Sequence, residues 1–316
     1  RLDNGDILAA MDQFGPGAPR SSATGRNNMG LLFRSKNNGE TWTKPIDAET
    51  GLLFSGTGGQ PDGPNYHCAP MPVVDHKGRL YRAFENCAPP SWPAGFRALV
   101  ISADADADLL KASSWIMSNH LIYDQETDPP EFAKGAEHLP GGKAAGWLEG
   151  NIIIAPDGRM FDILRANSLP VADRAAMVLV EDEGGKVSFD PKTGFIEFPG
   201  GMSKFSIRRD PQTGVYWTLA NNNTNPANPR QRNVLSLYSS RDLRSWKHQE
   251  TLLEDKEDFA RIGNDSKVGF QYVDFQFDGD DIIYLSRTAY NGAHNYHDAN
   301  YMTFHRIEKF RQRYDE

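Results

Sequence analysis

The segment Asn151-Ile-Ile-Ile-Ala-Pro-Asp-Gly-Arg-Met-Phe161 consists of two short apolar runs joined by a turn that contains Pro, Asp and Gly. This pattern is typical of two antiparallel β-strands joined by a tight turn. It recurs along the chain at intervals of several tens of residues. The other copies span residues 1–10, 72–81, 205–217 and 273–284. The sequence therefore predicts a repeated β-hairpin, and Asn4-Gly5 predicts a type I′ turn in the first copy.

A further strand candidate follows each hairpin, which gives three to four strands per repeat. These candidates span residues 30–34, 96–102, 176–181, 234–239 and 301–307. Small sheets repeated along a chain indicate a β-propeller, and a large β-sandwich is the alternative with strands of similar length. We predict an all-β, five-bladed β-propeller that forms one domain over residues 1–316, with its first inner strand incomplete at the N-terminus. The irregular stretch 103–145, or residues upstream of Arg1, leaves room for a sixth blade.

The composition agrees with short elements and excludes several classes of function. Among 316 residues, 29 Gly and 20 Pro interrupt helices and strands often, and no apolar run reaches the roughly 18 residues that a membrane helix needs. The net charge of −8 comes without a basic stripe, which argues against nucleic-acid binding. Two cysteines are too few for a zinc cage. We expect no membrane span, no nucleic-acid partner, and no metal or other cofactor.

The segment Ser35-Lys-Asn-Asn-Gly-Glu-Thr-Trp42 resembles the Asp box of sialidases, with Asn37 where Asp is usual. The resemblance predicts a turn in which Asn37 caps backbone N–H groups and Trp42 packs between strands. A shorter version at residues 240–246 also resembles turns of five-bladed arabinanases and invertases. Such a turn indicates the fold and carries no chemistry.

Residues 147–165, Trp-Leu-Glu-Gly-Asn-Ile-Ile-Ile-Ala-Pro-Asp-Gly-Arg-Met-Phe-Asp-Ile-Leu-Arg, resemble a sialidase segment in which Glu opens the inner strand of a blade and Arg ends the next strand. Arabinanase-like enzymes also place a catalytic Glu before such a strand. The resemblance implies that Glu149 is a catalytic acid or base and that Arg165 binds a substrate carboxylate. The alternative is that Glu149 is a solvated residue at the start of a strand.

Two further segments resemble sialidase motifs. Residues 270–277 resemble the segment that carries a nucleophilic tyrosine, which implies that Tyr272 attacks the sugar after Glu149 takes its proton. The alternative is that Tyr272 is an ordinary strand aromatic. Arg232, and less closely Arg230, precede a strand as one arginine of the sialidase triad does, and the alternative is a solvated loop arginine. An arginine suits this role because its guanidinium pairs with a carboxylate through two hydrogen bonds.

One motif departs from the sialidase pattern. The usual acid/base Asp falls in Arg26-Asn-Asn-Met-Gly30, where Asn27 and Asn28 stand instead. An amide does not donate a proton as a carboxylic acid does. Asp12 is the candidate substitute.

The last repeat contains a loop rich in Tyr, Asn and His between two strand candidates. Amides hydrogen-bond to sugar hydroxyls and aromatic rings stack on sugar C–H faces, so this composition suits a carbohydrate. We therefore assign a substrate-binding role to Arg287, Tyr290, Asn291, His294 and, from the preceding repeat, Asn222. The alternative for His294, together with its neighbour His297, is metal binding.

His67 precedes an inner strand much as Glu149 does, and Glu85 ends the strand opposite it. Propeller-fold polysaccharide lyases such as ulvan lyases are similar in their use of His and Tyr as base and acid. In that interpretation His67, Tyr272, Arg165 and Arg287 form the reacting set on a uronate. Neutralising the uronate carboxylate stabilises the carbanion-like state that forms when a base removes the proton at C5.

Cys68 and Cys87 are predicted to face each other across a hairpin. If Lys77-Gly78 is a two-residue turn, the register places the two cysteines directly opposite, within reach of a disulfide. Two buried free thiols are the alternative. A bridge would favour a secreted or periplasmic location, which we expect for this chain.

Together these features predict a sialidase-like glycoside hydrolase that acts on an acidic oligosaccharide or polysaccharide, with Glu149, Tyr272 and His67 as catalytic residues. A lyase acting on uronic-acid-containing glycans is the first alternative. A non-catalytic propeller that binds glycans is the second.

Overall fold

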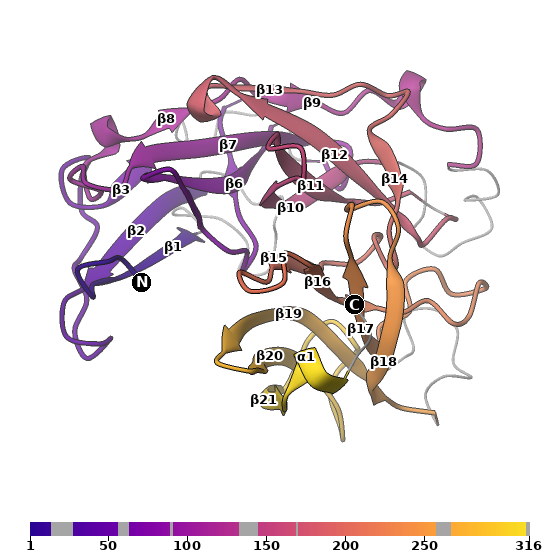
Figure 1. Cartoon of the computed structure of the whole chain (residues 1–316). Helices are drawn as coiled ribbons and strands as arrows, with labels where there is room; N and C mark the ends of the chain where they lie inside the picture. Colours follow the sequence, from indigo (N-terminus) through magenta and orange to yellow (C-terminus); the bar gives the residue numbers. More distant parts are fainter. Residues whose placement is uncertain are drawn as a thin grey trace. The chain divides into compact units, whose positions relative to one another are not determined.

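The computed structural model describes residues 1–13, 28–55, 63–88, 91–132, 145–168, 170–256 and 267–313. In this part of the chain, secondary structure consists of five β-sheets, a few single 3₁₀ turns and one short helix, α1 (Phe310–Arg313) (Figure 1). The sheets are the blades of a β-propeller, so the predicted all-β, five-bladed fold is confirmed. The described part of 103–145 contributes short strands to the second blade.

The chain forms two compact units. The first unit comprises residues 1–123, 146–152 and 179–188, and the second comprises residues 124–145, 153–178 and 189–316. The first sheet has the order β1 (Ile7–Gln13), β2 (Met29–Ser35), β3 (Leu52–Phe54). The second has the order β4 (Tyr66–His67), β6 (Arg79–Cys87), β7 (Phe96–Asp104), β8 (Ile116–Met117), with β5 (Val74–His76) paired to β6 and β9 (Leu121–Ile122) paired to β7. Both belong to the first unit.

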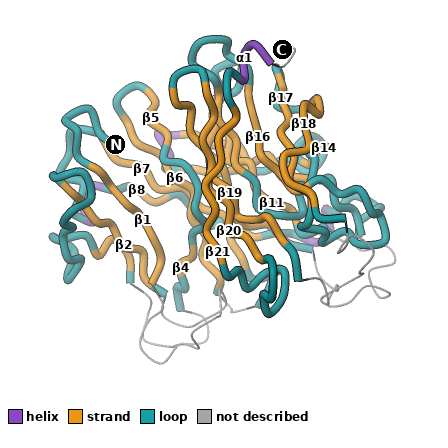
Figure 2. The backbone as a smooth tube through the Cα atoms, turned by 90° about the horizontal axis from the view of Figure 1, so that it is seen from below, coloured by secondary structure: helices purple, strands orange, loops and turns teal. Residues whose placement is uncertain are grey.

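The remaining strands form three sheets. The third sheet has the order β10 (Trp147–Ile154), β11 (Met160–Ala166), β12 (Arg174–Glu181), β13 (Lys186–Ser188), with β14 (Phe195–Glu197) paired to β12. The fourth has the order β15 (Ser206–Arg209), β16 (Tyr216–Asn221), β17 (Val234–Ser240), β18 (Lys247–Glu254). The fifth has the order β19 (Gly269–Asp278), β20 (Asp281–Ala289), β21 (Tyr301–Ile307), which lie side by side in Figure 2. The fourth and fifth belong to the second unit.

The predicted strands after each hairpin are all present, as β2, β7, β12, β17 and β21. The turn at Lys77 and Gly78 has positive φ at both residues, 57° and 78°, as a type I′ turn requires. The predicted type I′ turn at Asn4-Gly5 is wrong. Only Gly5 has positive φ there, and no strand precedes it, because the chain turns on itself through the hydrogen bond from Gly5 N–H to Leu2 O (2.9 Å).

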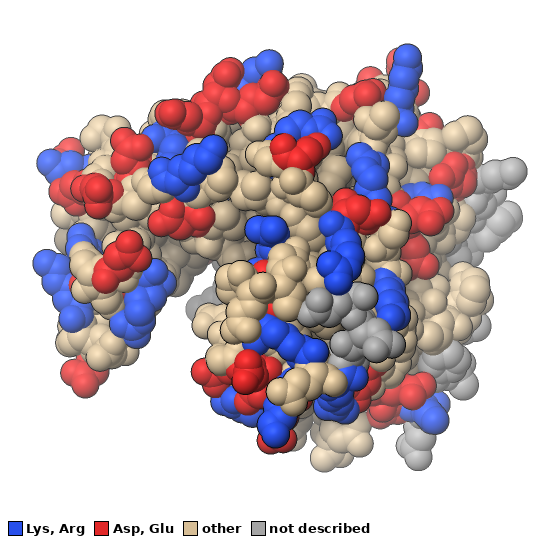
Figure 3. All heavy atoms as spheres, in the orientation of Figure 1, with Lys and Arg blue, Asp and Glu red and all other residues tan. Residues whose placement is uncertain are grey.

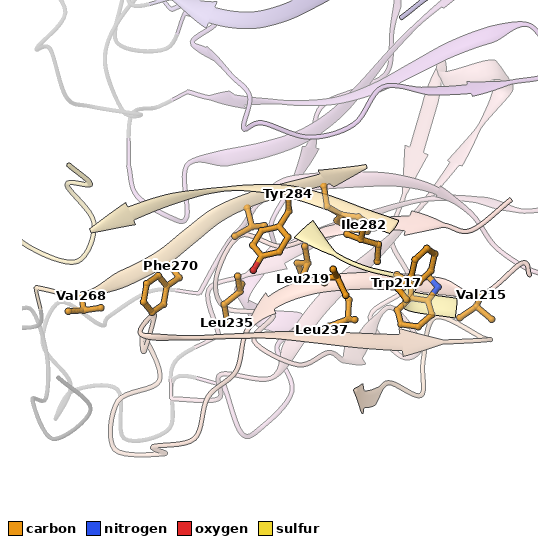
Figure 4. Close-up of a cluster of buried hydrophobic side chains, with 13 residues drawn as sticks. Val215, Trp217, Leu219, Leu235, Leu237, Val268, Phe270, Ile282 and Tyr284 are labelled. Atoms are coloured by element: carbon orange, nitrogen blue, oxygen red, sulfur yellow. The ribbon is translucent and has the colours of Figure 1, made fainter. Parts of the chain in front are cut away.

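The core of the second unit lies between its fourth and fifth sheets. Alternate residues of a strand face the same side, so Leu235 and Leu237 on β17 point together toward Tyr284 of β20, as Figure 4 shows. Trp217 of β16 is fully buried and meets the ring of Phe310 of α1 edge-on, with 5.2 Å between ring centroids. Each such side chain contributes about 1.5–3 kcal/mol on burial.

The Asp-box segment forms the predicted turn. Asn37 Oδ1 accepts from the N–H of Thr41 (2.9 Å) and Ser35 Oγ accepts from the N–H of Gly39 (2.8 Å). The predicted packing of Trp42 between strands is wrong. This indole is 40% exposed and donates to the carbonyl of Gly39 (2.9 Å), so it lies over its own turn.

The predicted disulfide is wrong: Cys68 and Cys87 are free, buried thiols. Strand β5 keeps the predicted register on β6. Strand β4 is displaced by three residues from that register, which pairs His67 with Glu85. Between β4 and β5 the chain leaves the sheet, and Arg82 holds this detour by donating to the carbonyls of two of its residues. The predicted disulfide was the support for a secreted or periplasmic location, and this support is absent.

Acidic and basic side chains are interspersed on the face shown in Figure 3, in agreement with a net charge of −8 without a basic stripe. No helix among the described residues has the length and hydrophobicity that crossing a membrane requires.

Candidate active site

Glu149 lies inside strand β10 in a left-handed backbone conformation, with φ of 61°. Non-glycine residues rarely adopt this conformation, and its cost of about 1–3 kcal/mol is met only where the surroundings enforce it. The side chain is buried, with 2% exposed, so Glu149 is not a solvated residue at a strand start. Its backbone N–H donates to the carboxylate of Glu85.

Glu85 connects the two predicted catalytic residues of the first unit. Its Oε2 lies 2.9 Å from Nδ1 of His67, and its Oε1 accepts from the N–H groups of Glu149 and, at 3.4 Å, Gly150. The carboxylate is almost completely buried, with 1% exposed. Glu85 was not among the predicted site residues, although its position opposite His67 was the signal that would have identified it.

His67 carries a proton because of this environment. Burial alone would lower its pKa, but the hydrogen bond and negative charge of Glu85, with further negative charge from Asp12 and Glu149, outweigh burial and raise the pKa to about 9. The ring packs edge-on against Phe96, with 5.3 Å between centroids. At neutral pH the ring of His67 is therefore an imidazolium.

The residues at the expected acid position differ in what they offer. Asn27 lies outside the described residues. Asn28 is fully buried, and its backbone N–H donates to Asn65 Oδ1 (3.1 Å). Asp12, the candidate substitute, lies on β1 and accepts from the thiol of Cys68 at 3.8 Å. Burial raises the pKa of that thiol to about 12. Asp12, Glu85 and Glu149 are thus three acidic side chains that surround His67.

In the second unit, Tyr272 also has a left-handed backbone, with φ of 52° inside strand β19. The pairing of β19 with β20 shifts register between Gln271 and Asp274, so Tyr272 lies in a β-bulge. Lys204, which is buried, donates to the carbonyl of Val273, the next residue. The bulge is therefore held by a charged side chain from the segment before β15.

Two guanidinium groups contact the Tyr272 ring. Arg287 lies 4.1 Å and Arg232 lies 5.7 Å from the ring centroid. Arg232 Nη1 donates to Gln271 Oε1 (2.5 Å), and Arg287 Nη2 donates to the carbonyl of His297 (2.8 Å). Both acceptors are neutral oxygens.

Arg165 and Arg230 add to this positive charge. Arg165 is 4% exposed and donates to the carbonyl of Met202 (2.7 Å). The pKa of Arg230 is lowered by burial and by the positive charges of Arg165 and Arg232. The structure thus brings together the predicted Arg165, Arg232, Arg287 and Tyr272. This concentration of positive charge suits an anionic ligand such as a carboxylate.

Three of the four remaining residues predicted to bind substrate lie on the loop that also carries His297. Tyr290, Asn291 and His294 are exposed on the loop between β20 and β21, and His294 Nδ1 lies 3.6 Å from Asp298. Asn222 is half-buried and donates its N–H to Val234 O (3.0 Å). None of the contacts described for these four residues joins them to the arginines.

His297 was considered only as a metal ligand, yet it lies beside Tyr272, with 6.0 Å between ring centroids. Burial, and then the charges of Arg232 and Arg287 against the opposing effect of Asp298, lower its pKa. Within the described residues, no group of three or more His, Cys, Asp or Glu side chains is placed to hold a metal ion.

No protein-family model and no curated protein matches this chain. Similar solved structures include the Hadza microbial sialidase Hz136, with a TM-score of 0.58 and 14% identity over 98% of this chain and 51% of that chain. The intramolecular trans-sialidase from Ruminococcus gnavus has a TM-score of 0.50 and 17% identity over 92% of this chain and 52% of that chain. The Penicillium chrysogenum α-L-arabinanase has a TM-score of 0.50 and 11% identity over 97% of this chain and 72% of that chain.

At these identities the likeness shows the fold, a propeller of the kind found in these proteins. The chain spans about half the length of the two sialidase structures.

Proposed function

We propose that this chain is a glycosidase that hydrolyses the glycosidic bond of a sugar bearing a carboxylate. Arg165, Arg232 and Arg287 bind the carboxylate, Tyr272 is the nucleophile and Glu149 is the base. One observation carries the proposal. Among the described residues, Glu149 and Tyr272 are the two non-glycine residues with left-handed φ inside a strand. Such strain clusters at functional sites, and the sialidase resemblance selects the same two residues.

The arginines support an acidic substrate. Arg165 and Arg232 are buried, with 4% and 7% exposed. A buried guanidinium group has lost hydration, and a bound carboxylate can offset that loss. A planar carboxylate matches the fork of a guanidinium and takes two parallel hydrogen bonds from it. The names of two similar structures, a sialidase and a trans-sialidase, agree with this substrate class.

The state of His67 favours hydrolysis over the lyase alternative. A lyase that used His67 as its base would need a neutral imidazole to remove a proton from carbon. The pairing with Glu85 keeps the imidazole protonated, because the pKa of His67 is about 9. A protonated ring is an acid, which suits hydrolysis.

Incubating the purified chain with a panel of sialosides and uronic-acid glycosides tests the proposal. We expect release of the free sugar without the near-ultraviolet absorbance of an unsaturated uronate. Glu149→Gln should lower kcat by at least about 10³-fold with an unchanged unfolding transition, and the exposed Glu40→Gln should match the wild type.

Three other outcomes contradict the proposal. Wild-type turnover by Glu149→Gln removes the assigned base. An unsaturated product identifies a lyase. Binding of an acidic glycan without any product identifies a non-catalytic propeller.

A further inference from the structure

The proposed hydrolysis needs a proton for the oxygen that leaves the sugar, and Glu149 and Tyr272 already have other roles. We propose that the imidazolium of His67, oriented by Glu85, is this proton donor. Glu85 then acts as a positioning residue. The inference rests on the proposed function and adds to it a catalytic acid in place of the amides Asn27 and Asn28.

The geometry leaves one ring nitrogen available. Glu85 accepts from Nδ1 of His67 at 2.9 Å, which fixes the ring and leaves Nε2 as the second donor. In the described part of the chain, no residue forms a hydrogen bond with Nε2. The side chain is 13% exposed. Glu85 itself is held in place because its other oxygen accepts the N–H groups of Glu149 and Gly150.

The charges around His67 keep its ring protonated. Glu85 faces it from β6, Asp12 from β1 and Glu149 from β10, and all three favour the protonated ring. At neutral pH His67 is therefore charged, and it loses its proton only to an oxygen that develops negative charge as a bond breaks.

The proton and electron pair balance through the reaction. Tyr272 attacks the anomeric carbon while Glu149 takes the phenol proton, and the bond between that carbon and the leaving oxygen breaks. The electron pair of the broken bond stays on the leaving oxygen, which takes the Nε2 proton of His67, and the neutral ring still donates through Nδ1 to Glu85. Water then attacks the anomeric carbon: its hydroxyl replaces the Tyr272 oxygen there, its remaining proton returns to Nε2 of His67, and Tyr272 takes its own proton back from Glu149. The net change is hydrolysis of one bond.

Two glycosides of one acidic sugar test the role of His67, one with 4-nitrophenol and one with methanol as the leaving group. Departure of 4-nitrophenolate needs little protonation, whereas departure of methoxide needs it fully. His67→Gln should therefore lower kcat about 10²–10⁴-fold on the methyl glycoside and less than about 10-fold on the nitrophenyl glycoside. The half-buried His76→Gln in the same sheet is the control and should leave both rates unchanged.

The rival acid is Asp12, and Asp12→Asn separates the two. If Asp12→Asn gives the selective loss on the methyl glycoside and His67→Gln does not, or if His67→Gln loses both substrates equally, the inference is overturned. A wild type that cleaves neither glycoside, nor any other acidic glycoside, overturns the proposed function and the inference with it.

A second measurement needs no substrate. Nuclear magnetic resonance titration of the histidine rings should find His67 protonated at pH 7.5 in the wild type, and neutral at that pH in Glu85→Gln. A neutral His67 in the wild type overturns the inference even if the enzyme hydrolyses its substrate. Unchanged protonation in Glu85→Gln removes the positioning role of Glu85.

Discussion

Glu149 and Tyr272 share an unusual backbone conformation, and charged side chains of opposite sign hold it in place. Each residue is left-handed inside a strand, and each is held by one buried charged side chain that bonds the backbone. Glu85 accepts the N–H of Glu149, and Lys204 donates to the carbonyl after Tyr272. The segment around Glu149 lies near Glu85 and Asp12, and we call it the acid-rich segment. The segment around Tyr272 lies near Arg232 and Arg287, and we call it the cation-rich segment. In our proposal the acid-rich segment transfers protons and the cation-rich segment binds an anion.

The largest effect is expected from the cation-rich segment. Tyr272→Phe keeps the ring that Arg287 contacts but removes the attacking oxygen. It should lower kcat on an acidic glycoside by at least about 10³-fold, or about 4 kcal/mol, with little change in the unfolding midpoint. The exposed Tyr301→Phe is the matched control. A Tyr272→Phe variant within about 10-fold of the wild type would assign the nucleophile elsewhere.

The raised pKa of His67 in the acid-rich segment should make the free energy of unfolding depend on pH. The folded-state pKa of His67 is raised from 6.5 to about 9. A raised pKa contributes stability that is fully present below pH 6.5 and is lost as pH rises through about 9. We expect urea unfolding to show a loss of up to about 3 kcal/mol over this window. The same loss in His67→Gln would show that another group causes it.

From the sequence we selected Glu149 and Tyr272 as catalytic candidates, because each lies in a local motif that resembles a sialidase motif. The left-handed backbone of both residues, and the charged side chains that hold it, were not predicted. Glu85 and Lys204 act on backbone 64 and 69 residues away, a contact that no local pattern encodes. The blades could be predicted from apolar runs and turns, because a hairpin forms between residues that are close in sequence.

Replacing Lys204 tests whether the backbone at Tyr272 depends on a buried charge as much as the backbone at Glu149 does. Lys204→Met keeps a long side chain and removes the donor to the Val273 carbonyl, which Ser206 Oγ still reaches at 2.6 Å. We expect a loss of about 1–3 kcal/mol in the free energy of unfolding and a lower kcat. Glu85→Gln, measured by the same denaturation, is the counterpart in the acid-rich segment. Unchanged stability and kcat in Lys204→Met would mean that the bulge persists without this charge.

The smallest effect concerns the cysteines beside the acid-rich segment. Burial raises the pKa of Cys68 to about 12 and that of Cys87 to about 11, so few thiolates exist at pH 8. We expect iodoacetamide to modify neither residue in the folded protein and both after denaturation, and we expect reductant to leave the unfolding midpoint unchanged. A bridge was predicted because the register was extended past β5, but the detour held by Arg82 displaces β4. Two thiols that appear only after reduction would show that the detour closes and restores the predicted register.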